Sequence, residues 1–367
     1  MREDWEYKEL GEVCDIYQPK TISNEMLVKG GKYPVYGANG TIGFYNRYNH
    51  TDSEILLTCR GATCGTINVS QPYSWINGNA MVIHRKSDYL DFKYLYFLMT
   101  SLDYSLIING AAQPQITRAR LAPIQVAIPP KPTQLSIVSE LDKLNELIQI
   151  KKEQLKDYDT LAQSIFYEMF GDPVENEKGW EVKKLKDISR KIGDGLHGTP
   201  EYSELDTGWY FINGNNLENG CISIKSTTKK VTDFVRKKYY VEMDDFTLLV
   251  SINGTLGKSA FYNGENVILG KSACYIKLNK DVNKLFIYEI IRGEYFKRYA
   301  ESVCTGTTIR NVSLKAMREF PIIYPPLPLQ HSFAQKIEQI EQQKATIQKT
   351  ITDLETLLAA RMQYWFD

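Results

Sequence analysis

Two long stretches of this chain repeat apolar residues at alternating spacings of three and four, which is typical of α-helices that pair along a seam. The first stretch covers residues 134–170, and its seam positions are Leu141, Leu144, Ile148, Lys151, Leu155, Tyr158, Ala162, Ile165 and Met169. The second covers residues 330–366, and its seam positions are Ile337, Ile340, Lys344, Ile347, Ile351, Leu354, Leu358, Arg361 and Trp365. Each stretch predicts a coiled-coil helix on the order of 55 Å long.

The residues before each long helix carry short β-branched and aromatic runs separated by Gly and Asn, a pattern that predicts strands. Two shorter helices are expected near 92–107 and 284–298. A double proline stands before each long helix. Because proline cannot continue a strand ladder but fits the start of a helix, it marks the junction. The clearest strand runs are Ile55–Thr58, Met81–Ile83, Thr247–Ser251 and Ala273–Ile276.

The chain is an internal repeat in which the order of segments is preserved while the loops differ. Residues 5–13, which begin with Trp-Glu, recur at 180–188, an offset of 175. Leu56-Leu57 recurs as Leu248-Leu249, an offset of 192. The segment Pro-Pro-Lys-Pro-Thr-Gln at 129–134 recurs as Pro-Pro-Leu-Pro-Leu-Gln, an offset of 196. The growing offset indicates an insertion of 17 residues, and then one of 4, in the second copy.

These patterns predict an α+β fold with a pseudo-two-fold repeat: two globular α/β domains in tandem, each followed by a long α-helix. The expected bounds are 1–132 and 173–328 for the globular domains, and 133–172 and 329–367 for the helical spacers. We expect the two helices to pair as an antiparallel coiled coil that holds the globular domains at opposite ends. Lys151 and Lys344 either set the register of the seam or lie at solvated ends of it.

Composition places the chain among ordinary globular proteins and excludes several classes. Of its 367 residues, 43% are hydrophobic and 24% are charged. The N-terminus is acidic and lacks the apolar core of a signal peptide, and no run approaches the roughly 18 apolar residues of a membrane span. The six cysteines form no CxxC pair, which favours reduced, structural thiols in a cytoplasmic protein. We expect no membrane association.

The search for catalytic motifs is negative. Two segments end in Gly-Lys-Ser, but Ile252 and Glu265 stand where a P-loop has its first glycine. The double prolines lack the flanking residues of an adenine-methyltransferase motif, HExxH is absent, and the four histidines are dispersed. The Glu-x-Lys pairs at 6–8 and 181–183 lack the upstream Pro-Asp of a nuclease site. We therefore expect no active site, metal or cofactor in this chain.

What remains is a set of loops rich in Gly, Asn and Thr with interleaved basic residues. Asn, Gln and Arg side chains make paired contacts to base edges in the major groove, and loops on a scaffold can vary without disturbing the core. Gly and Asn also simply form turns, which is the competing interpretation. The candidate DNA contacts are Asn39, Thr41, Arg60, Thr63, Gln113, Gln115, Arg118, Arg120, His197, Asn215, Asn216, Lys230, Lys237, Asn253, Thr255, Lys258, Thr307, Arg310 and Asn311.

The net charge of zero is a sum of unlike parts. Residues 1–132 carry 13 basic and 12 acidic residues, and residues 173–328 carry 23 and 19, so the globular parts total +5. The helical segments total −5. The basic clusters at 229–230 and 236–238 either contact phosphates or form a solvated face. Because the surplus is small, we expect tight DNA binding to need partner subunits.

The doubled Trp-Glu opening, the two divergent globular parts and the doubled PPxPxQ entry into a coiled-coil helix resemble the specificity subunit of type I restriction–modification systems. The resemblance covers essentially the whole chain, and the PPxPxQ entry is its most specific mark. Local matches to the target-recognition domains of that family are residues 33–43, 57–65 and 194–202. Motifs that are shared by domains with different DNA targets cannot themselves determine the target, so these three segments are expected to be mainly scaffold.

The resemblance implies a DNA-recognition subunit without catalysis, in which each target-recognition domain reads one half of a bipartite, asymmetric site. It implies two modification subunits that dock on the helical spacers and carry adenine methylation with S-adenosylmethionine. Restriction subunits would add ATP- and Mg-dependent translocation and cleavage. The second half lacks the Tyr-Gly-Ala-Asn-Gly loop of the first and holds the long insertion, which predicts two different half-sites.

Two other functions remain open at this point. The chain could be the recognition portion of a fused methyltransferase–nuclease, although the missing methyltransferase motif counts against this. It could also be a coiled-coil scaffold that binds only protein, which sequence-selective DNA binding would exclude. The target bases do not follow from the sequence, because readout depends on loop geometry and DNA shape as much as on side-chain type.

Overall fold

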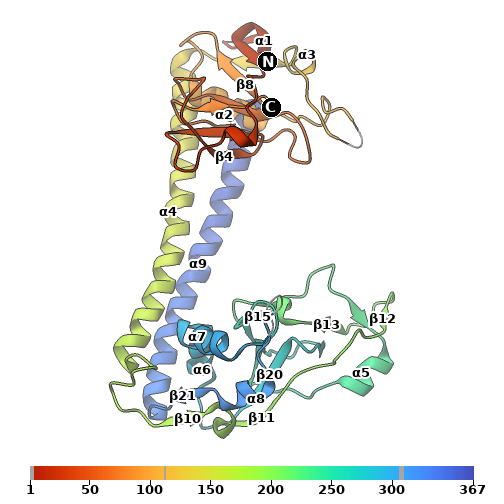
Figure 1. Cartoon of the computed structure of the whole chain (residues 1–367), viewed down its shortest axis with the longest axis vertical. Coiled ribbons are helices and arrows are strands. Elements are labelled where there is room, and N and C mark those ends of the chain that lie inside the picture. Colours follow the sequence, from red (N-terminus) through yellow and green to blue (C-terminus); the bar gives the residue numbers. More distant parts are fainter. Residues whose placement is uncertain (1–3, 111–112, 306–309) are drawn as a thin grey trace. The chain divides into compact units, whose positions relative to one another are not determined.

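The computed structural model describes residues 4–110, 113–305 and 310–367, and the chain forms two compact units (Figure 1). The first unit contains residues 1–153 and 348–367, and the second contains residues 154–347. The long helices α4 (Lys131–Phe170) and α9 (Leu327–Phe366) each contribute one end to each unit. Every unit therefore combines a globular α/β part with a segment of paired helix.

The globular part of the first unit consists of short strands and short helices. Its main sheet has the order β2-β8-β5-β6 with antiparallel pairs, and a smaller sheet has the order β4-β3-β7, in which β3 and β7 run parallel. Strand β1 pairs with β9, directly before α4. The elements are β1 (Glu6–Glu9), α1 (Leu10–Val13), β2 (Cys14–Tyr17), η1 (Asn24–Met26), β3 (Tyr33–Gly37), β4 (Gly40–Tyr45), β5 (Ile55–Thr58), β6 (Ile67–Val69), β7 (Trp75–Ile76), β8 (Ala80–Arg85), α2 (Phe92–Ser101), α3 (Arg118–Leu121) and β9 (Gln125–Ile128).

Strand β5 is buried on both faces, which explains why its sequence is an unbroken apolar run. Ile55 and Leu57 on one face join the core that contains α2. Leu56 on the opposite face packs with Tyr36 and Ile76 of the smaller sheet. The main sheet therefore separates a core shared with α2 from a second core shared with the smaller sheet.

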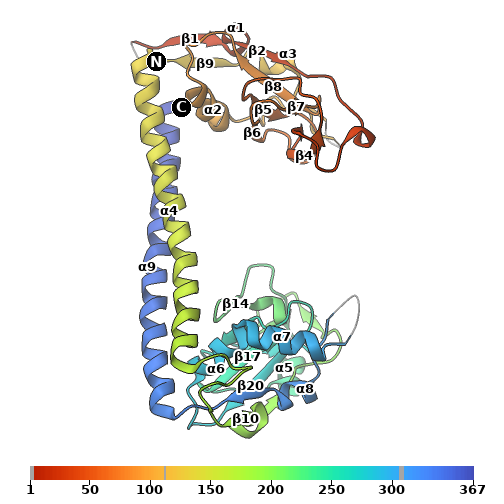
Figure 2. The ribbon, with the colours of Figure 1, turned by 60° about the vertical axis from the view of Figure 1, so that its left-hand side comes forward.

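The second unit has the same layers with more elements (Figure 2). Its main sheet has the order β11-β20-β17-β18, and a smaller sheet has the order β12-β16-β13-β19, in which β13 and β19 run parallel. Strand β10 pairs with β21, and β14 with β15. The elements are β10 (Val182–Lys184), η2 (Leu185–Ile188), β11 (Ser189–Gly193), β12 (Tyr202–Ser203), β13 (Tyr210–Ile212), η3 (Gly214–Asn216), β14 (Leu217–Glu218), β15 (Cys221–Ile222), β16 (Lys230–Val231), α5 (Asp233–Tyr239), β17 (Thr247–Ser251), β18 (Ser259–Phe261), β19 (Val267–Leu269), β20 (Ala273–Leu278), α6 (Lys284–Arg292), α7 (Glu294–Val303), α8 (Leu314–Glu319) and β21 (Pro321–Ile323).

The repeat is present in the strand ladders, but its offset differs by one residue from the predicted one. Ile55 faces Ile83 across β5 and β8, and Leu248 faces Ile276 across β17 and β20. The equivalent of Ile55 is therefore Leu248, an offset of 193. The predicted match of Leu56 with Leu248 is wrong because adjacent leucines look alike in sequence, and only the ladder distinguishes them.

The 17-residue insertion lies between β13 and β17. Tyr36 pairs with Ile76 in the first unit as Ile212 pairs with Leu269 in the second, so β3 and β13 are still related by an offset of 176. By β17 the offset has grown to 193. The additional residues therefore fall within 213–247, the segment that holds β14, β15, β16 and α5.

A fully buried glutamine explains the PPxPxQ motif before each long helix. The side-chain oxygen of Gln134 accepts a hydrogen bond from the Asp91 N–H at 2.7 Å, and its nitrogen donates to the carbonyl of the first proline at 2.9 Å. Gln330 makes the same two contacts, to the Asn283 N–H at 3.1 Å and to a proline carbonyl at 2.8 Å. Because Asp91 and Asn283 cap α2 and α6, each glutamine locks a long helix onto its globular part.

Within each unit α4 and α9 run antiparallel, as predicted (Figure 2). Every predicted seam position on both helices is buried or partly buried. The side chain of Lys344 is only 19% exposed and is paired, so it is one of the polar contacts that select the register. The ion pairs that cross the seam include Glu140 with Arg361 and Lys152 with Glu355 in the first unit, and Asp159 with Lys344 in the second.

Four predicted helix bounds are wrong. The long helices begin three residues earlier than predicted, at Lys131 and Leu327, because the third proline of each motif fits the first helical turn. Helix α2 ends at Ser101, since Leu102 is extended. The helix predicted over 284–298 is two helices, because Gly293 has an extended backbone (φ −77°, ψ 168°) that ends α6 and begins α7.

Two further features concern the described ranges as a whole. No helix in them combines the length and the apolar character that crossing a membrane requires. All six cysteines lie within these ranges and are free thiols, and burial raises the pKa of Cys14 to about 12.

Candidate nucleic-acid interface

In the first unit, the loop after β5 lies against the loop before α3. Arg60 and Gln115 pair as an isolated β-bridge, and the Gly61 N–H donates to the Pro114 carbonyl oxygen at 3.0 Å. Arg60 is exposed and Gln115 is half-buried. The structure therefore brings together two predicted contact residues that are 55 positions apart.

The turn between β3 and β4 joins these two loops. The Thr63 hydroxyl donates to the Asn39 side-chain oxygen at 2.6 Å, and the Thr58 hydroxyl donates to the Ala38 carbonyl. Asn39 and Thr63 are both exposed. Four predicted residues thus share one accessible surface, which we call loop surface 1: Asn39, Arg60, Thr63 and Gln115.

The other predicted residues of the first half extend this surface. Thr41 is exposed on β4, directly after the Asn39 turn, and Gln113 is exposed in the Gln115 loop. Arg118 and Arg120 are exposed on α3, which begins three residues after Gln115. Loop surface 1 is therefore flanked by two cations.

The second unit repeats these backbone contacts with different side chains. Asn253 and Asn311 form the isolated bridge, and the Gly254 N–H donates to the Arg310 carbonyl oxygen at 2.9 Å. The exposed Arg310 guanidinium lies 2.9 Å from a carboxylate oxygen of Glu301. The bridging loops define loop surface 2, which comprises Asn253, Thr255, Arg310 and Asn311.

The turn after β13 packs against the end of β17, which leads into loop surface 2. The Gly214 N–H donates to the Ser272 hydroxyl at 3.0 Å, and that hydroxyl donates to the Asn213 side-chain oxygen at 2.9 Å. A Cβ at Gly214 would lie 2.1 Å from the Ser251 hydroxyl oxygen, so only glycine allows the turn to approach the end of β17. Asn215 is exposed in this turn, beside loop surface 2.

His197 also lies next to this region. Leu196 forms a parallel bridge with Gly270, and the Lys271 N–H donates to the Leu196 carbonyl oxygen at 3.0 Å. The exposed His197 ring has its Nε2 2.7 Å from a carboxylate oxygen of Asp194. The predicted motif at 194–202 therefore borders the turn that precedes β20.

Two predicted residues have structural surroundings instead. Asn216 accepts a hydrogen bond from the Asn213 N–H at 3.0 Å and donates to the Ser223 carbonyl at 3.0 Å, so both atoms of its amide hold the turn. Lys258 lines a pocket together with Glu218 and Arg292, and none of the residues of loop surface 2 lines this pocket. The structure does not bring these two side chains to loop surface 2.

The remaining predicted residues lie away from the loops or outside the described ranges. Lys230 is on β16, and its ammonium lies 3.1 Å from a carboxylate oxygen of Asp206. Lys237 is exposed on α5. Thr307 lies outside the described residues. The predicted set therefore contains two loop surfaces and a separate basic region.

Two residues that pair with Gln115 and Asn311 inside the bridging loops, Asn109 and Thr305, were not predicted from the sequence. Asn109 and Gln115 exchange two backbone hydrogen bonds of 2.8 Å, and Thr305 and Asn311 exchange two of 3.0 Å. Asn109 and Thr305 are related by the same offset of 196 as the long helices. A search for equal-length loops at that offset would have found them.

Titratable side chains meet elsewhere without forming a recognisable metal cluster. His84 Nδ1 lies 3.0 Å from each carboxylate oxygen of Glu54, and burial raises the pKa of Glu54. His50 Nε2 lies 2.9 Å from the Tyr17 hydroxyl. Across residues 4–110, 113–305 and 310–367, no group of three or more His, Cys, Asp and Glu side chains is arranged to hold a metal ion.

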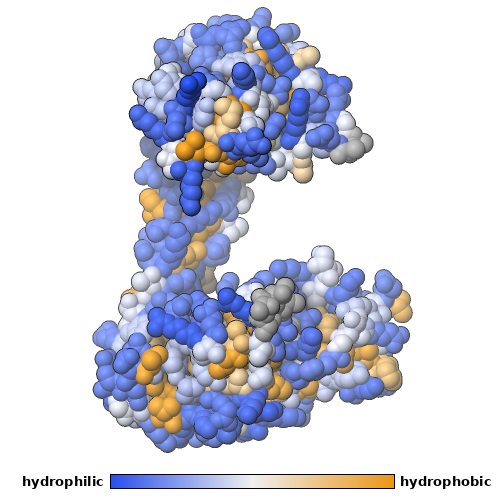
Figure 3. Space-filling view, viewed as in Figure 1, coloured by the Kyte–Doolittle hydropathy of each residue, from blue (hydrophilic) through white to orange (hydrophobic). Residues whose placement is uncertain are grey.

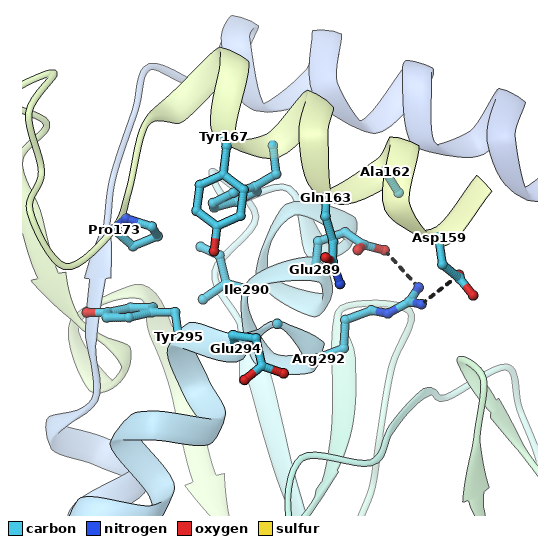
Figure 4. Close-up of a pocket in the computed structure, with 12 residues that line it drawn as sticks. Asp159, Ala162, Gln163, Tyr167, Pro173, Glu289, Ile290, Arg292, Glu294 and Tyr295 are labelled. Carbon is cyan, nitrogen blue, oxygen red and sulfur yellow. Dashed lines mark hydrogen bonds and ion pairs between the residues drawn. The ribbon is translucent and has the colours of Figure 1, made fainter. Parts of the chain in front are cut away.

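A cavity of about 60 Å³ in the second unit lies between α4 and the junction of α6 with α7. Figure 4 shows Arg292 between Asp159 and Glu289, and its two terminal nitrogens lie 3.3 Å from a carboxylate oxygen of each. Burial raises the pKa of Glu289. Because Asp159 also binds Lys344, this network joins α6 to both long helices.

Comparisons with known proteins agree on one family. A profile of the type I restriction modification DNA specificity domain matches residues 2–157 and 177–356. A Mycoplasma pneumoniae protein named as a type I specificity subunit is 24% identical over 338 residues, which covers 90% of this chain and 87% of that protein. The EcoDI type I restriction enzyme specificity subunit of Escherichia coli is 19% identical over 388 aligned positions, covering 95% and 84%.

A solved structure has the same fold. It comes from work on complex assembly and conformational transition of the type I R-M system, and its TM-score is 0.64. At 15% sequence identity, the alignment covers 99% of this chain and 97% of that one. The likeness concerns the arrangement of the chain, since so low an identity leaves the loops free to differ.

Proposed function

This chain is a DNA-recognition subunit that belongs to the type I restriction modification DNA specificity family, and we propose that it reads a bipartite, asymmetric site through loop surfaces 1 and 2. The observation that carries the proposal is one backbone arrangement that occurs twice with different side chains. Arg60 pairs with Gln115 where Asn253 pairs with Asn311. Because base edges are distinguished by side-chain donors and acceptors, this difference suits two different half-sites.

In this proposal the helix pair sets the gap between the half-sites. Helices α4 and α9 are each 40 residues long, or about 60 Å. Half-sites one helical turn of DNA apart are separated by about 34 Å. A shift in the register of the helix pair would therefore change the spacing that the subunit accepts.

Two modification subunits dock on α4 and α9 in this proposal. The support is a surface motif that occurs once on each helix at an offset of 196: Asp157-Tyr-Asp-Thr-Leu161 and Asp353-Leu-Glu-Thr-Leu357. Leu161 is 45% exposed and Leu357 is 46% exposed, and Figure 3 shows hydrophobic side chains at the surface of the long helices. Isolated exposed leucines are ordinary, but a repeated motif suits two copies of one partner.

Catalysis belongs to the partners in this proposal. The modification subunits bind S-adenosylmethionine and methylate adenine, and restriction subunits use ATP and Mg²⁺ when they join the complex. This chain contributes no active site and no cofactor site, and it acts in the cytoplasm on double-stranded DNA. The support is the sequence itself, which contains neither a P-loop nor a methyltransferase motif.

The test is to exchange the globular segments 1–132 and 173–328 and to assemble the product with the modification subunits. Methylated adenines are then located in genomic DNA by sequencing. We expect the two half-sites to appear in reversed order with their individual sequences unchanged. Methylation at the original site after the exchange would show that the globular segments do not read the DNA.

A further inference from the structure

The insertion that distinguishes the second unit holds the most basic segment of its globular part. Residues 225–241 carry six basic residues and one acidic residue. The rest of residues 173–328 carries 17 basic and 18 acidic residues. The whole positive surplus of this globular part therefore lies in one segment, which contains β16 and α5.

Helix α5 is fixed on the strands that support loop surface 2. Val235 is 3% exposed and packs with Phe211 of β13 and Ile268 of β19. The Thr232 hydroxyl caps the helix by accepting from the Val235 N–H at 3.4 Å. Because β13 and β19 lead directly into the turns beside loop surface 2, α5 and the reading loops share one support.

The opposite face of α5 is basic and partly apolar. Phe234, Lys237 and Lys238 stand three and four positions apart, so they share one face of the helix. Phe234 is 64% exposed, and both lysines are exposed. The Lys238 ammonium lies 5.6 Å from the centre of the Phe234 ring. An exposed phenylalanine on the same helix face as two lysines combines an apolar surface for a sugar with cations for phosphate.

Two neighbouring cations are already engaged. Arg236 binds Asp233 at 3.2 Å and stacks 5.0 Å from the centre of the Trp209 ring, and Lys230 is paired with Asp206. In the described part of the chain, by contrast, no carboxylate lies within ion-pair distance of Lys237 or Lys238. These two lysines are available to an external anion.

The first unit has a similar concentration of charge on its own smaller sheet. Residues 18–51, which include β3 and β4, carry four basic residues and one acidic residue. The rest of residues 1–132 carries 9 basic and 11 acidic residues. Lys32 lies 5.2 Å from the centre of the Tyr33 ring, and Tyr48 is 42% exposed. The combination of cations with accessible aromatic rings therefore occurs in both units.

We propose that Phe234, Lys237 and Lys238 of α5 form a clamp on the DNA backbone that supplies affinity without reading sequence. Phosphate contacts fix position and orientation but carry no sequence information directly, whereas contacts to base edges specify sequence. The clamp holds the duplex while loop surface 2 reads it. This inference rests on the proposed function, because it requires that the second unit binds duplex DNA.

The test compares two double variants in the complex with the modification subunits. Lys237→Gln/Lys238→Gln removes the clamp cations, and Lys280→Gln/Lys315→Gln makes the same charge change at exposed lysines outside α5. Binding to a specific duplex and to a non-specific duplex is measured against salt concentration, and methylation sites are sequenced. Thermal unfolding of each variant confirms that the fold is retained.

We expect the clamp variant to weaken both affinities by the same factor and to lower the salt slope by about 0.9 for each lost phosphate contact. The methylated sequence and the control variant should match the wild-type complex. An unchanged slope, an equal loss in the control, or a changed methylation sequence would each overturn the clamp. A wild-type complex that does not discriminate between the two duplexes would instead contradict the proposed function.

Discussion

Glu140 and Arg361, 221 residues apart in the sequence, form a bidentate ion pair in the first unit. Arg361 Nη2 lies 3.1 Å from Glu140 Oε2, and Nε donates to the other oxygen. Trp365 Nε1 donates to the same carboxylate at 3.1 Å. The Arg361 hydrogen bond holds the pKa of Glu140 below its ordinary value. Because the pair joins the first part of α4 to the last part of α9, it fixes their antiparallel register.

Separating this pair should cost more than separating a simple surface pair. A double-mutant cycle on Glu140→Ala and Arg361→Ala is expected to give a larger stabilising coupling than a more exposed pair, because each of these two side chains is only about one-third exposed. The more exposed pair Lys152 and Glu355 is the matched control, with an expected coupling below about 0.5 kcal/mol. Chemical denaturation gives both values. Equal couplings would mean that Glu140 and Arg361 do not set the register.

The buried glutamines of the PPxPxQ motifs should act on one unit each. Gln134→Ala leaves the Asp91 N–H and a proline carbonyl without their partners, which should destabilise the first unit by about 1 to 3 kcal/mol. Gln330→Ala should do the same in the second unit. Hydrogen exchange, read separately in each unit, measures the effect, and the exposed Gln163→Ala on α4 should stay within about 0.5 kcal/mol. Loss of protection in the second unit of Gln134→Ala, or in the first unit of Gln330→Ala, would show that the glutamines do not stabilise one unit each.

The helices were the most predictable part of the fold, for a physical reason. A seam that repeats every seven residues leaves a strong sequence pattern, and all predicted seam positions are shielded. Helix ends are harder, because Gly293 breaks a helix through its backbone conformation alone. Strand registers are harder still. Adjacent leucines such as Leu56 and Leu57 fit either register by sequence, and only cross-strand pairing decides.

The contact surfaces were only partly predictable. The sequence identifies the loops by composition, but it does not show that Arg60 pairs with Gln115 or that the Asn216 amide is occupied by backbone groups. Such partners are set by tertiary packing over dozens of residues. For α5 the sequence identifies Lys237 and the basic cluster at 236–238 as candidates for DNA contact, but not Phe234, because Phe234 and Lys237 acquire a common face only once the segment is helical.

Glu319 should make stability depend on acidity. Hydrogen bonds from Lys184 at 2.5 Å and Lys186 at 2.7 Å lower the pKa of Glu319 from 4.5 to about 2. A folded-state pKa below the unfolded one means stabilisation that is present above pH 4.5 and is lost as the pH falls toward 2. The melting temperature of Glu319→Gln should therefore fall less between these pH values than that of the wild type. Glu338→Gln, a change at an exposed residue of α9, should show the same pH dependence of the melting temperature as the wild type. If all three proteins lose melting temperature equally between these pH values, the ion pairs of Glu319 do not cause the pH dependence.

The repeated motif on the long helices predicts stoichiometry. Leu161→Asp and Leu357→Asp each put a charge into one of two equivalent sites, so each should remove one modification subunit, and the double variant should remove both. Native mass spectrometry of the assembled complex counts the subunits. Leu205→Asp, at a leucine that is 78% exposed outside the helices, should keep two. Loss of both subunits from a single variant would show that the sites are not independent.

The two loop surfaces should control different halves of the DNA site. Arg60→Ala removes a side chain able to make two hydrogen bonds to a guanine, which should reduce discrimination at one base pair by about 1 to 3 kcal/mol. Because Arg60 belongs to loop surface 1, the change should appear in one half-site only, and Asn253→Ala should alter the other half. Methylation of duplex libraries with one randomised half-site measures both effects. Arg298→Ala, exposed on α7, should leave both halves unchanged. Each loop surface is supported by its own core, because Cys59 and Ile116 beside loop surface 1 belong to one hydrophobic cluster and Ile252 and Val312 beside loop surface 2 belong to another. A single substitution that relaxes both half-sites would therefore mean that the two units do not read DNA separately.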